Sequence, residues 1–321
     1  MFIWHLCQWL KDQGEWNGGI HALDLCAAPG GKSTLLLSAL PQDSSMIANE
    51  IMPKRAQILR ENISKWTKQT DTEVIVTNNS PADVARLGKG IFDFILCDVP
   101  CSGEGMFRKD DEAIEDWSLQ NVAMCQERQR DIVETIWPSL REGGFMIYST
   151  CTYNTLEDED NVRWIASELG AEIISVPVPE EWNVTPSPFY HFYPHRVKGE
   201  GFFCALLRKG SADEPESEEP RNKKKDSRTA SLSSLLSGSK KGKTPTLKVL
   251  PLENKYEPPF ADVDSLTALR YLHGEAIVLP PDTPRGIVTI TYMGLPLGQA
   301  KNIGARANNL YPKEWRIRKQ V

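Results

Sequence analysis

Short apolar runs alternate with helical patterns over the first 209 residues of the chain. The apolar runs are bounded by turn-forming residues and predict strands over 22–27, 46–50, 73–77, 92–98, 144–151 and 171–176. Between them, apolar residues recur every three to four positions, most clearly over 119–140, which predicts helices. This order is typical of βαβ units and predicts an α/β domain with a mostly parallel sheet.

Two further patterns frame this region. At the start, Phe2, Ile3, Leu6, Trp9 and Leu10 fall on one helical face, which predicts a helix rather than a signal peptide. After the Pro-rich stretch 186–194, the apolar run 201–208 has no crossover helix before it. We therefore expect this last strand to return antiparallel to its neighbour.

The composition changes at about residue 210. Residues 210–245 hold an acidic block, a basic block and a Ser/Gly/Lys stretch, with too little apolar surface to fold, so they predict a disordered charged linker. Residues 246–321 contain short strand-like runs over 276–279 and 286–292 and predict a small β-rich domain. We expect a first domain over 1–209, a linker over 210–245 and a second domain over 246–321.

The charge is unevenly distributed. The whole chain carries a net charge of −6, which argues mildly against nucleic acid as a partner because phosphates attract basic surfaces. Residues 246–321, however, contain 10 Lys/Arg and 7 Asp/Glu, and 301–321 contain six basic residues and one acid. The second domain is therefore the part whose charge favours contact with nucleic acid.

The composition also excludes several classes of protein. No apolar run approaches the roughly 18 residues that a membrane span needs, so no membrane partner is expected. The seven cysteines include no CxxC pair, so neither a zinc site nor a disulfide scaffold is predicted, and we expect no metal. Scattered cysteines in a chain of this size fit the reducing cytoplasm.

The first predicted strand leads into a glycine-rich turn, Cys26-Ala-Ala-Pro-Gly-Gly-Lys32, and then into a helix. Such a turn brings backbone N–H groups at a positive helix end close to a ligand. A Walker A loop is a minor alternative, because Gly31-Lys32-Ser33 fits its end but its first glycine would fall at Cys26. Glu50 lies at the tip of the second strand, where folds of this kind hold a ribose.

Two cysteines follow apolar strands that end at the same edge of the predicted sheet. Asp98 ends the predicted strand 92–98 and Cys101 follows three residues later, and Cys151 ends the strand 144–151. In open parallel sheets, ligands bind beyond the carboxyl ends of the strands. Two cysteines and an acid at two such ends therefore form a candidate site, whereas an isolated cysteine is more often a small buried side chain.

These motifs resemble those of the Fmu/Sun family of RNA cytosine-carbon-5 methyltransferases. The similar segments are Cys26–Lys32, Asp98-Val-Pro-Cys-Ser-Gly103, Ser149-Thr-Cys-Thr152, and Pro194-His195 with Glu200-Gly-Phe-Phe203. The tail from Lys301 to Arg318 is similar to the PUA-like region of the RsmF branch, which methylates small-subunit ribosomal RNA. The resemblance implies a Rossmann-like S-adenosylmethionine-dependent methyltransferase sheet with a small PUA-like C-terminal domain.

The chemistry of that family explains the residue types. Carbon 5 of cytosine reacts with a methyl donor after a thiolate adds at carbon 6, and a carboxyl group assists at ring nitrogen 3. The resemblance implies that Cys151 attacks the base, that Cys101 assists release, that Asp98 contacts the base edge and that Lys32 positions base or cofactor. It also implies a target base unstacked from RNA, with 16S rRNA or the small ribosomal subunit as the partner. The residues expected to bind S-adenosylmethionine are Cys26, Ala27, Ala28, Pro29, Gly30, Gly31, Lys32, Glu50, Ser80 and Asp98.

The chain departs from the family pattern at two places. Ser80 stands where the family usually has an Asp near the adenine of the cofactor, and Asp83 is a possible substitute one turn later. The family also carries an N-terminal RNA-binding segment and a Gln/Ser-rich motif, which would end where this chain begins at Met1. We expect the chain as given to bind the cofactor weakly.

Two alternative functions remain open at this point. A non-catalytic RNA-binding relative of a methyltransferase would fail to bind S-adenosylmethionine. In a DNA cytosine methyltransferase, the Pro-Cys cysteine, here Cys101, would attack the base in place of Cys151. The target nucleotide, the native start of the chain and the oligomeric state do not follow from the sequence.

Overall fold

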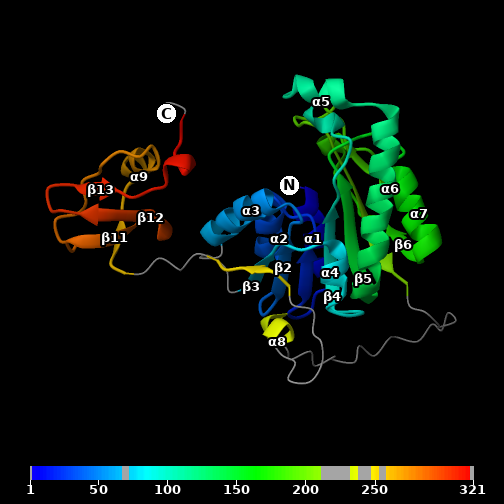
Figure 1. Cartoon of the computed structure of the whole chain (residues 1–321), viewed down its shortest axis with the longest axis horizontal. Helices are drawn as coiled ribbons and strands as arrows, with labels where there is room; N and C mark the ends of the chain where they lie inside the picture. The colour runs from blue at the N-terminus through cyan, green and yellow to red at the C-terminus, as the bar shows by residue number, and fades with distance from the viewer. Residues whose placement is uncertain (1, 67–71, 211–231, 238–246, 253–257, 319–321) are drawn as a thin grey trace. The chain divides into compact units, whose positions relative to one another are not determined.

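The computed structural model describes residues 2–66, 72–210, 232–237, 247–252 and 258–318. These residues form two compact units, one ending at Leu252 and the other beginning at Glu253. Figure 1 shows both units. None of the helices in this described part is long and apolar enough to cross a membrane.

The first unit is built on a nine-stranded sheet with the strand order β6-β8-β5-β4-β1-β2-β3-β9, and β7 pairs with β8. The five strands β1 to β5 run parallel to one another, whereas β8 runs antiparallel to β5, β6 and β7. The strands are β1 (His21–Asp24), β2 (Ser45–Asn49), β3 (Glu73–Thr77), β4 (Phe92–Asp98), β5 (Leu140–Thr150), β6 (Ala171–Ile174), β7 (Tyr190–Phe192), β8 (Phe202–Lys209) and β9 (Val249–Leu250). The expected parallel sheet and antiparallel return of 201–208 are confirmed.

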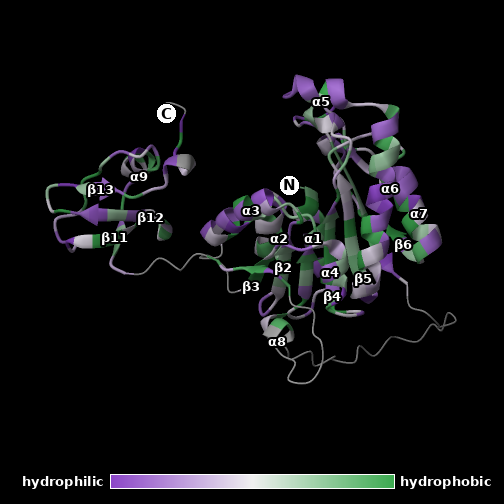
Figure 2. Cartoon of the chain, in the orientation of Figure 1, coloured by the Kyte–Doolittle hydropathy of each residue, from purple (hydrophilic) through white to green (hydrophobic). Residues whose placement is uncertain are grey.

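Helices cover both faces of this sheet, because successive strand residues point to opposite sides. Ala22 packs into a core with α1, α2 and α3, whereas its neighbour Leu23 packs into a second core with α4, α6, α7 and α8. Figure 2 shows the apolar residues concentrated on the central strands and polar residues on the outer sides of α6 and α7. The helices are α1 (Phe2–Asp12), α2 (Gly31–Ala39), α3 (Pro53–Trp66), α4 (Pro81–Ala85), α5 (Asp111–Asp116), α6 (Leu119–Ile136), α7 (Glu159–Leu169) and α8 (Leu232–Ser237).

The first unit extends further along the chain than the sequence predicts. Helix α8 lies inside the expected linker, yet Leu232 is 1% exposed and belongs to the core shared with α4, α6 and α7. Strand β9 lies inside the expected second domain and pairs antiparallel with β3, so that Val249 faces Thr77. Residues 211–231 and 238–245 of the expected linker lie outside the described residues.

Among its described residues, the second unit has a four-stranded sheet with the order β10-β11-β12-β13, the α-helix α9 (Ser265–Leu272) and the short 3-10 helix η5 (Lys313–Trp315). Its strands are β10 (Phe260–Asp262), β11 (Gly286–Tyr292), β12 (Leu295–Asn302) and β13 (Ala307–Asn309). The predicted strand 286–292 is confirmed. The predicted strand 276–279 is not formed, because this segment makes only an isolated bridge between Ile277 and Ala307.

Candidate active site

The glycine-rich turn links β1 to α2 and is held by side chains from neighbouring elements. Arg55 donates a hydrogen bond to the carbonyl of Ala28 at 2.9 Å, and Asn62 donates to that of Pro29 at 2.8 Å. Gly30 has a φ of 112°, in the region that side-chain-bearing residues rarely adopt, and it directly precedes α2. The turn therefore leads directly into the N-terminus of α2, and its backbone borders the cavity next to β1.

A cavity of about 800 Å³ lies against this turn. Its polar side includes Asp24 and Lys32, and its apolar side includes Phe2 and Phe202. The expected cofactor-binding residues that line it are Cys26, Ala27, Ala28, Pro29, Gly31, Lys32 and Asp98. A mostly apolar pocket with a few polar groups has the character of a site for a cofactor with an aromatic base.

Sequence reasoning missed one acid and most of the apolar wall of this cavity. Asp24 is fully buried; its Oδ2 accepts a hydrogen bond from Ser33 at 2.6 Å, and its Oδ1 has no partner. Burial raises the pKa of Asp24 to about 7. Its place at the carboxyl end of β1 was the available signal. Phe2, Trp182 and Phe202 come from distant parts of the chain, so no local pattern could have joined them.

Glu50 and Ser80 lie outside the described lining of the cavity. Glu50 directly follows β2, is 2% exposed, and accepts a hydrogen bond from the backbone of Met52 at 2.9 Å. Ser80 is the N-cap of α4: its Oγ donates to Asp83 at 2.6 Å and accepts from the backbone N–H of Asp83. The hydroxyl of Ser80 and the carboxylate of Asp83 are therefore engaged with each other in a capping box.

The two cysteines of the candidate site are brought together by the pairing of β4 with β5. Asp98 lies opposite Ser149 in this parallel pair, so Cys101 and Cys151 follow strand ends that lie side by side. Their sulfur atoms are 3.0 Å apart. Cys151 is exposed and Cys101 is partly buried. The geometry therefore joins the two residues that the resemblance implicates.

Asp98 and Lys32 form an ion pair next to the thiols. The Lys32 Nζ lies 2.9 Å from Asp98 Oδ2, and Ser149 donates to Asp98 Oδ1 at 2.7 Å. Burial acts to lower the pKa of Lys32, but the carboxylate of Asp98 outweighs it and the net pKa is raised. Lys32 therefore keeps its positive charge in a partly buried position.

The environment separates the acidities of the two thiols. The pKa of Cys151 is lowered, mainly by the hydrogen bond between its sulfur and that of Cys101 and also by the charge of Lys32. Burial and the charge of Asp98 act in the opposite direction but are outweighed. The same hydrogen bond, together with burial, raises the pKa of Cys101 well above its usual value. The thiolate is the nucleophilic form of cysteine, and these pKa shifts favour its formation at Cys151 over Cys101.

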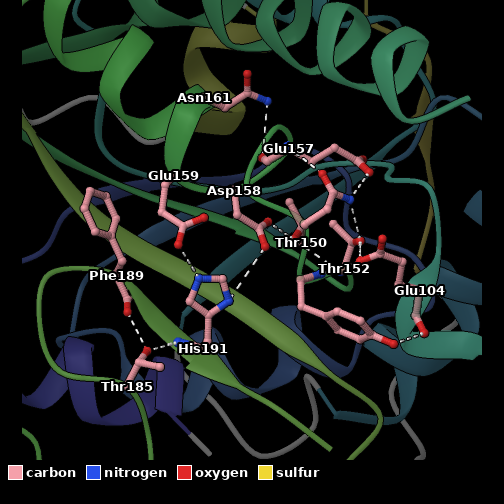
Figure 3. Close-up of polar contacts among 12 residues, drawn as sticks. Glu104, Thr150, Thr152, Glu157, Asp158, Glu159, Asn161, Thr185, Phe189 and His191 are labelled. Carbon is pink, nitrogen blue, oxygen red and sulfur yellow. Dashed lines mark hydrogen bonds and ion pairs between the residues drawn. The ribbon is translucent and has the colours of Figure 1, made fainter. Parts of the chain in front are cut away.

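Another polar cluster lies beside the loop that follows β5. His191 Nε2 is 2.8 Å from Glu159 Oε1, and His191 Nδ1 is 3.8 Å from Asp158 Oδ2 (Figure 3). Asp158 Oδ1 also accepts a hydrogen bond from Thr150 at 2.6 Å. Glu159 and Asp158 approach different nitrogens of the His191 ring. Because Asp158 also bonds Thr150, the cluster connects β7 to the residue that precedes Cys151.

Comparison with known proteins matches both units of the chain. A family model described as 16S rRNA methyltransferase RsmB/F matches residues 10–208, and one described as methyltransferase RsmF PUA domain matches residues 260–317. The ribosomal RNA small subunit methyltransferase F of Aliivibrio fischeri (strain MJ11) is 34% identical over 199 residues, which are 60% of this chain and 41% of the relative. The ribosomal RNA small subunit methyltransferase F of Serratia proteamaculans (strain 568) is 28% identical over 350 residues, which cover 91% of this chain and 72% of the relative.

Solved structures show the same fold for the first unit. NSun6 from Pyrococcus horikoshii with SFG is 28% identical, with a TM-score of 0.52 over 60% of this chain and 48% of that chain. A methyltransferase homolog protein from Pyrococcus horikoshii is 25% identical, with a TM-score of 0.50 over 60% of this chain and 62% of that chain. The fold is therefore Rossmann-like, of the methyltransferase type, and the second unit is a PUA domain.

Proposed function

The chain belongs to the RsmB/F family of 16S rRNA methyltransferases, and from this premise we propose that it transfers a methyl group from S-adenosylmethionine to carbon 5 of a cytosine in RNA. The proposal rests on the Cys101 and Cys151 thiols, whose sulfur atoms are 3.0 Å apart. They follow the carboxyl ends of the parallel strands β4 and β5, beside the Lys32–Asp98 ion pair. Small-subunit ribosomal RNA is the proposed substrate, because the curated relatives carry that name. A cytoplasmic location follows from that substrate.

The cavity beside the glycine-rich turn fits S-adenosylmethionine. Asp24 offers a buried carboxylate oxygen without a hydrogen-bond partner, and Phe2 and Phe202 offer apolar surface to an aromatic base. The residues that would hold the cofactor are Cys26 to Lys32 together with Asp24 and Asp98. Glu50, at the same edge of the sheet, is the proposed partner of the ribose. When bound, the cofactor supplies an electrophilic methyl group.

Different residues of the chain carry out different steps of the proposed reaction on the cytosine. The Cys151 thiolate adds to carbon 6 of cytosine, which makes carbon 5 nucleophilic toward the methyl donor. Asp98 contacts the base edge, where its carboxylate accepts a hydrogen bond from ring nitrogen 3 once that nitrogen is protonated in the adduct, and Lys32 holds the carboxylate in place through their ion pair. After methyl transfer, Cys101 is the proposed base that takes the carbon 5 proton. The electron pair of that C–H bond re-forms the double bond between carbons 5 and 6 and expels the Cys151 thiolate from carbon 6.

A non-catalytic RNA-binding protein is the alternative function. The C-terminal PUA domain and the basic character of 301–321 would suit it. The presence of both thiols in contact argues against it, because binding RNA requires neither. Binding of S-adenosylmethionine separates the two possibilities, since only the enzyme needs the cofactor.

Bisulfite sequencing tests the proposal directly. Ribosomal RNA from cells with and without the gene is treated and sequenced, since 5-methylcytosine resists conversion. We expect one or more small-subunit cytosines to lose protection when the gene is absent and to regain it with the wild-type gene but not with Cys151→Ala. An unchanged pattern of protection would exclude ribosomal RNA as the substrate.

A further inference from the structure

The loops that carry the two cysteines are tied together from the Cys101 side by Glu104. This residue begins the short helix η2 (Glu104–Met106) and is 6% exposed. Its Oε2 accepts hydrogen bonds from Thr152 Oγ1 at 2.5 Å and from the backbone N–H of Tyr153 at 2.9 Å. Its Oε1 accepts from Trp117 at 3.1 Å. Glu104 therefore reaches across to the two residues that follow Cys151 (Figure 3).

Glu157 makes the same connection in the opposite direction. It lies beyond Cys151 on the loop after β5 and is fully buried. Its Oε2 accepts from the backbone N–H of Ser102 at 3.0 Å and from Gln129 at 2.6 Å. Its Oε1 accepts from Asn154 at 2.8 Å. Each cysteine loop thus sends one buried carboxylate to the residues next to the other cysteine.

The backbones of the two loops also touch. The N–H of Gly105 donates to the carbonyl of Cys151 at 2.8 Å. A Cβ at position 105 would lie 2.5 Å from that same oxygen, so only glycine allows the contact. This backbone contact therefore adds to the two carboxylates in holding the loops together.

We propose that Glu104 and Glu157 are positioning residues that hold the Cys101 and Cys151 thiols in contact through these reciprocal hydrogen bonds. All the partners of the two carboxylates are donors, and a carboxylate accepts at both oxygens. A glutamine of the same shape would turn an N–H₂ group toward these donors. The glutamate side chains are thus required for their charge distribution as well as for their length.

The catalytic consequence rests on the proposed function. If the loops separate, Cys151 still lies close enough to Asp98 and Lys32 to feel their charges, but Cys101 no longer reaches the reacting base. We expect Glu157→Gln and Glu104→Gln to slow release of the product more than attack. Covalent protein–RNA complex should then accumulate, as for Cys101→Ala, so kcat and the apparent KM for RNA should fall together while kcat/KM stays near the wild-type value.

A trivalent arsenical measures the thiol contact without any RNA. One molecule of phenylarsine oxide forms two As–S bonds with two adjacent thiols and releases one water, so no oxidant is needed. The protein is incubated with the reagent, and the Cys101–Cys151 bridge is quantified by peptide mass spectrometry. We expect wild type to form this bridge and each Glu→Gln variant to form it about 10-fold less readily, the size of losing a hydrogen bond to a charged group.

Glu159→Gln is the matched control. Glu159 is two residues from Glu157 and bonds His191, but it has no contact with the Cys101 loop among the described hydrogen bonds. Its bridging should equal that of wild type. Thr152→Val removes one donor to Glu104 and should give a smaller loss, which keeps the test decisive if a glutamate variant folds poorly.

The outcomes separate the positioning role from the proposed function. Wild-type bridging in Glu104→Gln and Glu157→Gln, or no bridge in wild type, would overturn the positioning role. Loss of bridging in both variants, with no RNA methylated by any form of the protein, would support the role and reject the function. Equal loss in Glu159→Gln would show general loosening and also overturn it.

Discussion

The acidity of a residue at this site depends more on its neighbours than on its residue type. Cys101 and Cys151 are chemically identical, yet their hydrogen bond and the nearby Lys32 give Cys151 the lower pKa. The sequence predicted both residues and their shared location. It could not predict the difference in acidity, because that difference depends on a contact between residues 50 positions apart.

Ser80 has a structural role that the resemblance did not suggest. Its place after β3 suggested a contact with the adenine, but its hydroxyl caps α4. We expect Ser80→Ala to lower the free energy of unfolding by about 1 kcal/mol, the usual cost of losing an N-cap. Affinity for S-adenosylmethionine, measured by calorimetry, should not change. A weaker affinity at unchanged stability would place Ser80 at the cofactor.

Asp24 should make stability depend on pH. Its pKa of about 7 lies above the unfolded value near 3.8, so the folded state holds more protons between these pH values. Stability must then fall as pH rises through this window. Asp24→Asn removes the effect and should gain stability relative to wild type above pH 7, by on the order of 4 kcal/mol at most. Urea unfolding at pH 5 and pH 8 measures this, and parallel profiles would contradict it.

At the scale of elements, the order of strands and helices could be predicted because each obeys a local pattern. Strands β3, β4 and β11 begin and end where the apolar runs do. Helix α8 and strand β9 could not be predicted, because their sequences show no clear hydrophobic pattern. They are stabilised by contacts with elements far away in the sequence. The cavity wall from α1 and β8 escaped prediction for the same reason.

The packing of α8 gives a prediction at this scale. Leu232 is 1% exposed in a segment that otherwise reads as a linker. Leu232→Ala should therefore cost about 2–5 kcal/mol of unfolding free energy, as buried leucines do. Leu119→Ala is the control, since Leu119 is 72% exposed and should change stability little. Denaturant unfolding compares the two, and equal small effects would mean that α8 does not pack on the core.

At the scale of the whole molecule, the proposed catalytic cysteines and the basic segment 301–321 belong to different units. The thiols belong to the first unit, whereas 301–321 holds six basic residues and one acid. The net charge of −6 therefore says little about the affinity for RNA, because the charge of each unit matters separately.

The PUA domain is predicted to supply affinity for RNA that does not depend on sequence. The candidate contacts are Lys301, Arg306, Arg316 and Arg318. Each lost phosphate contact should reduce the slope of log affinity against log salt by about 0.7–0.9. The double variant Lys301→Ala/Arg306→Ala should therefore bind RNA more weakly and with a flatter slope. An unchanged slope in filter binding would assign the domain to a protein partner instead.

A covalent complex between protein and RNA distinguishes the proposed roles of Cys151 and Cys101. Cys151→Ala removes the attacking thiolate, so neither methylated RNA nor covalent complex should form. Cys101→Ala leaves the attack intact and stalls elimination, so a complex that survives denaturing gel electrophoresis should accumulate. A complex that forms with Cys151→Ala but not with Cys101→Ala would reverse the two roles and contradict the account.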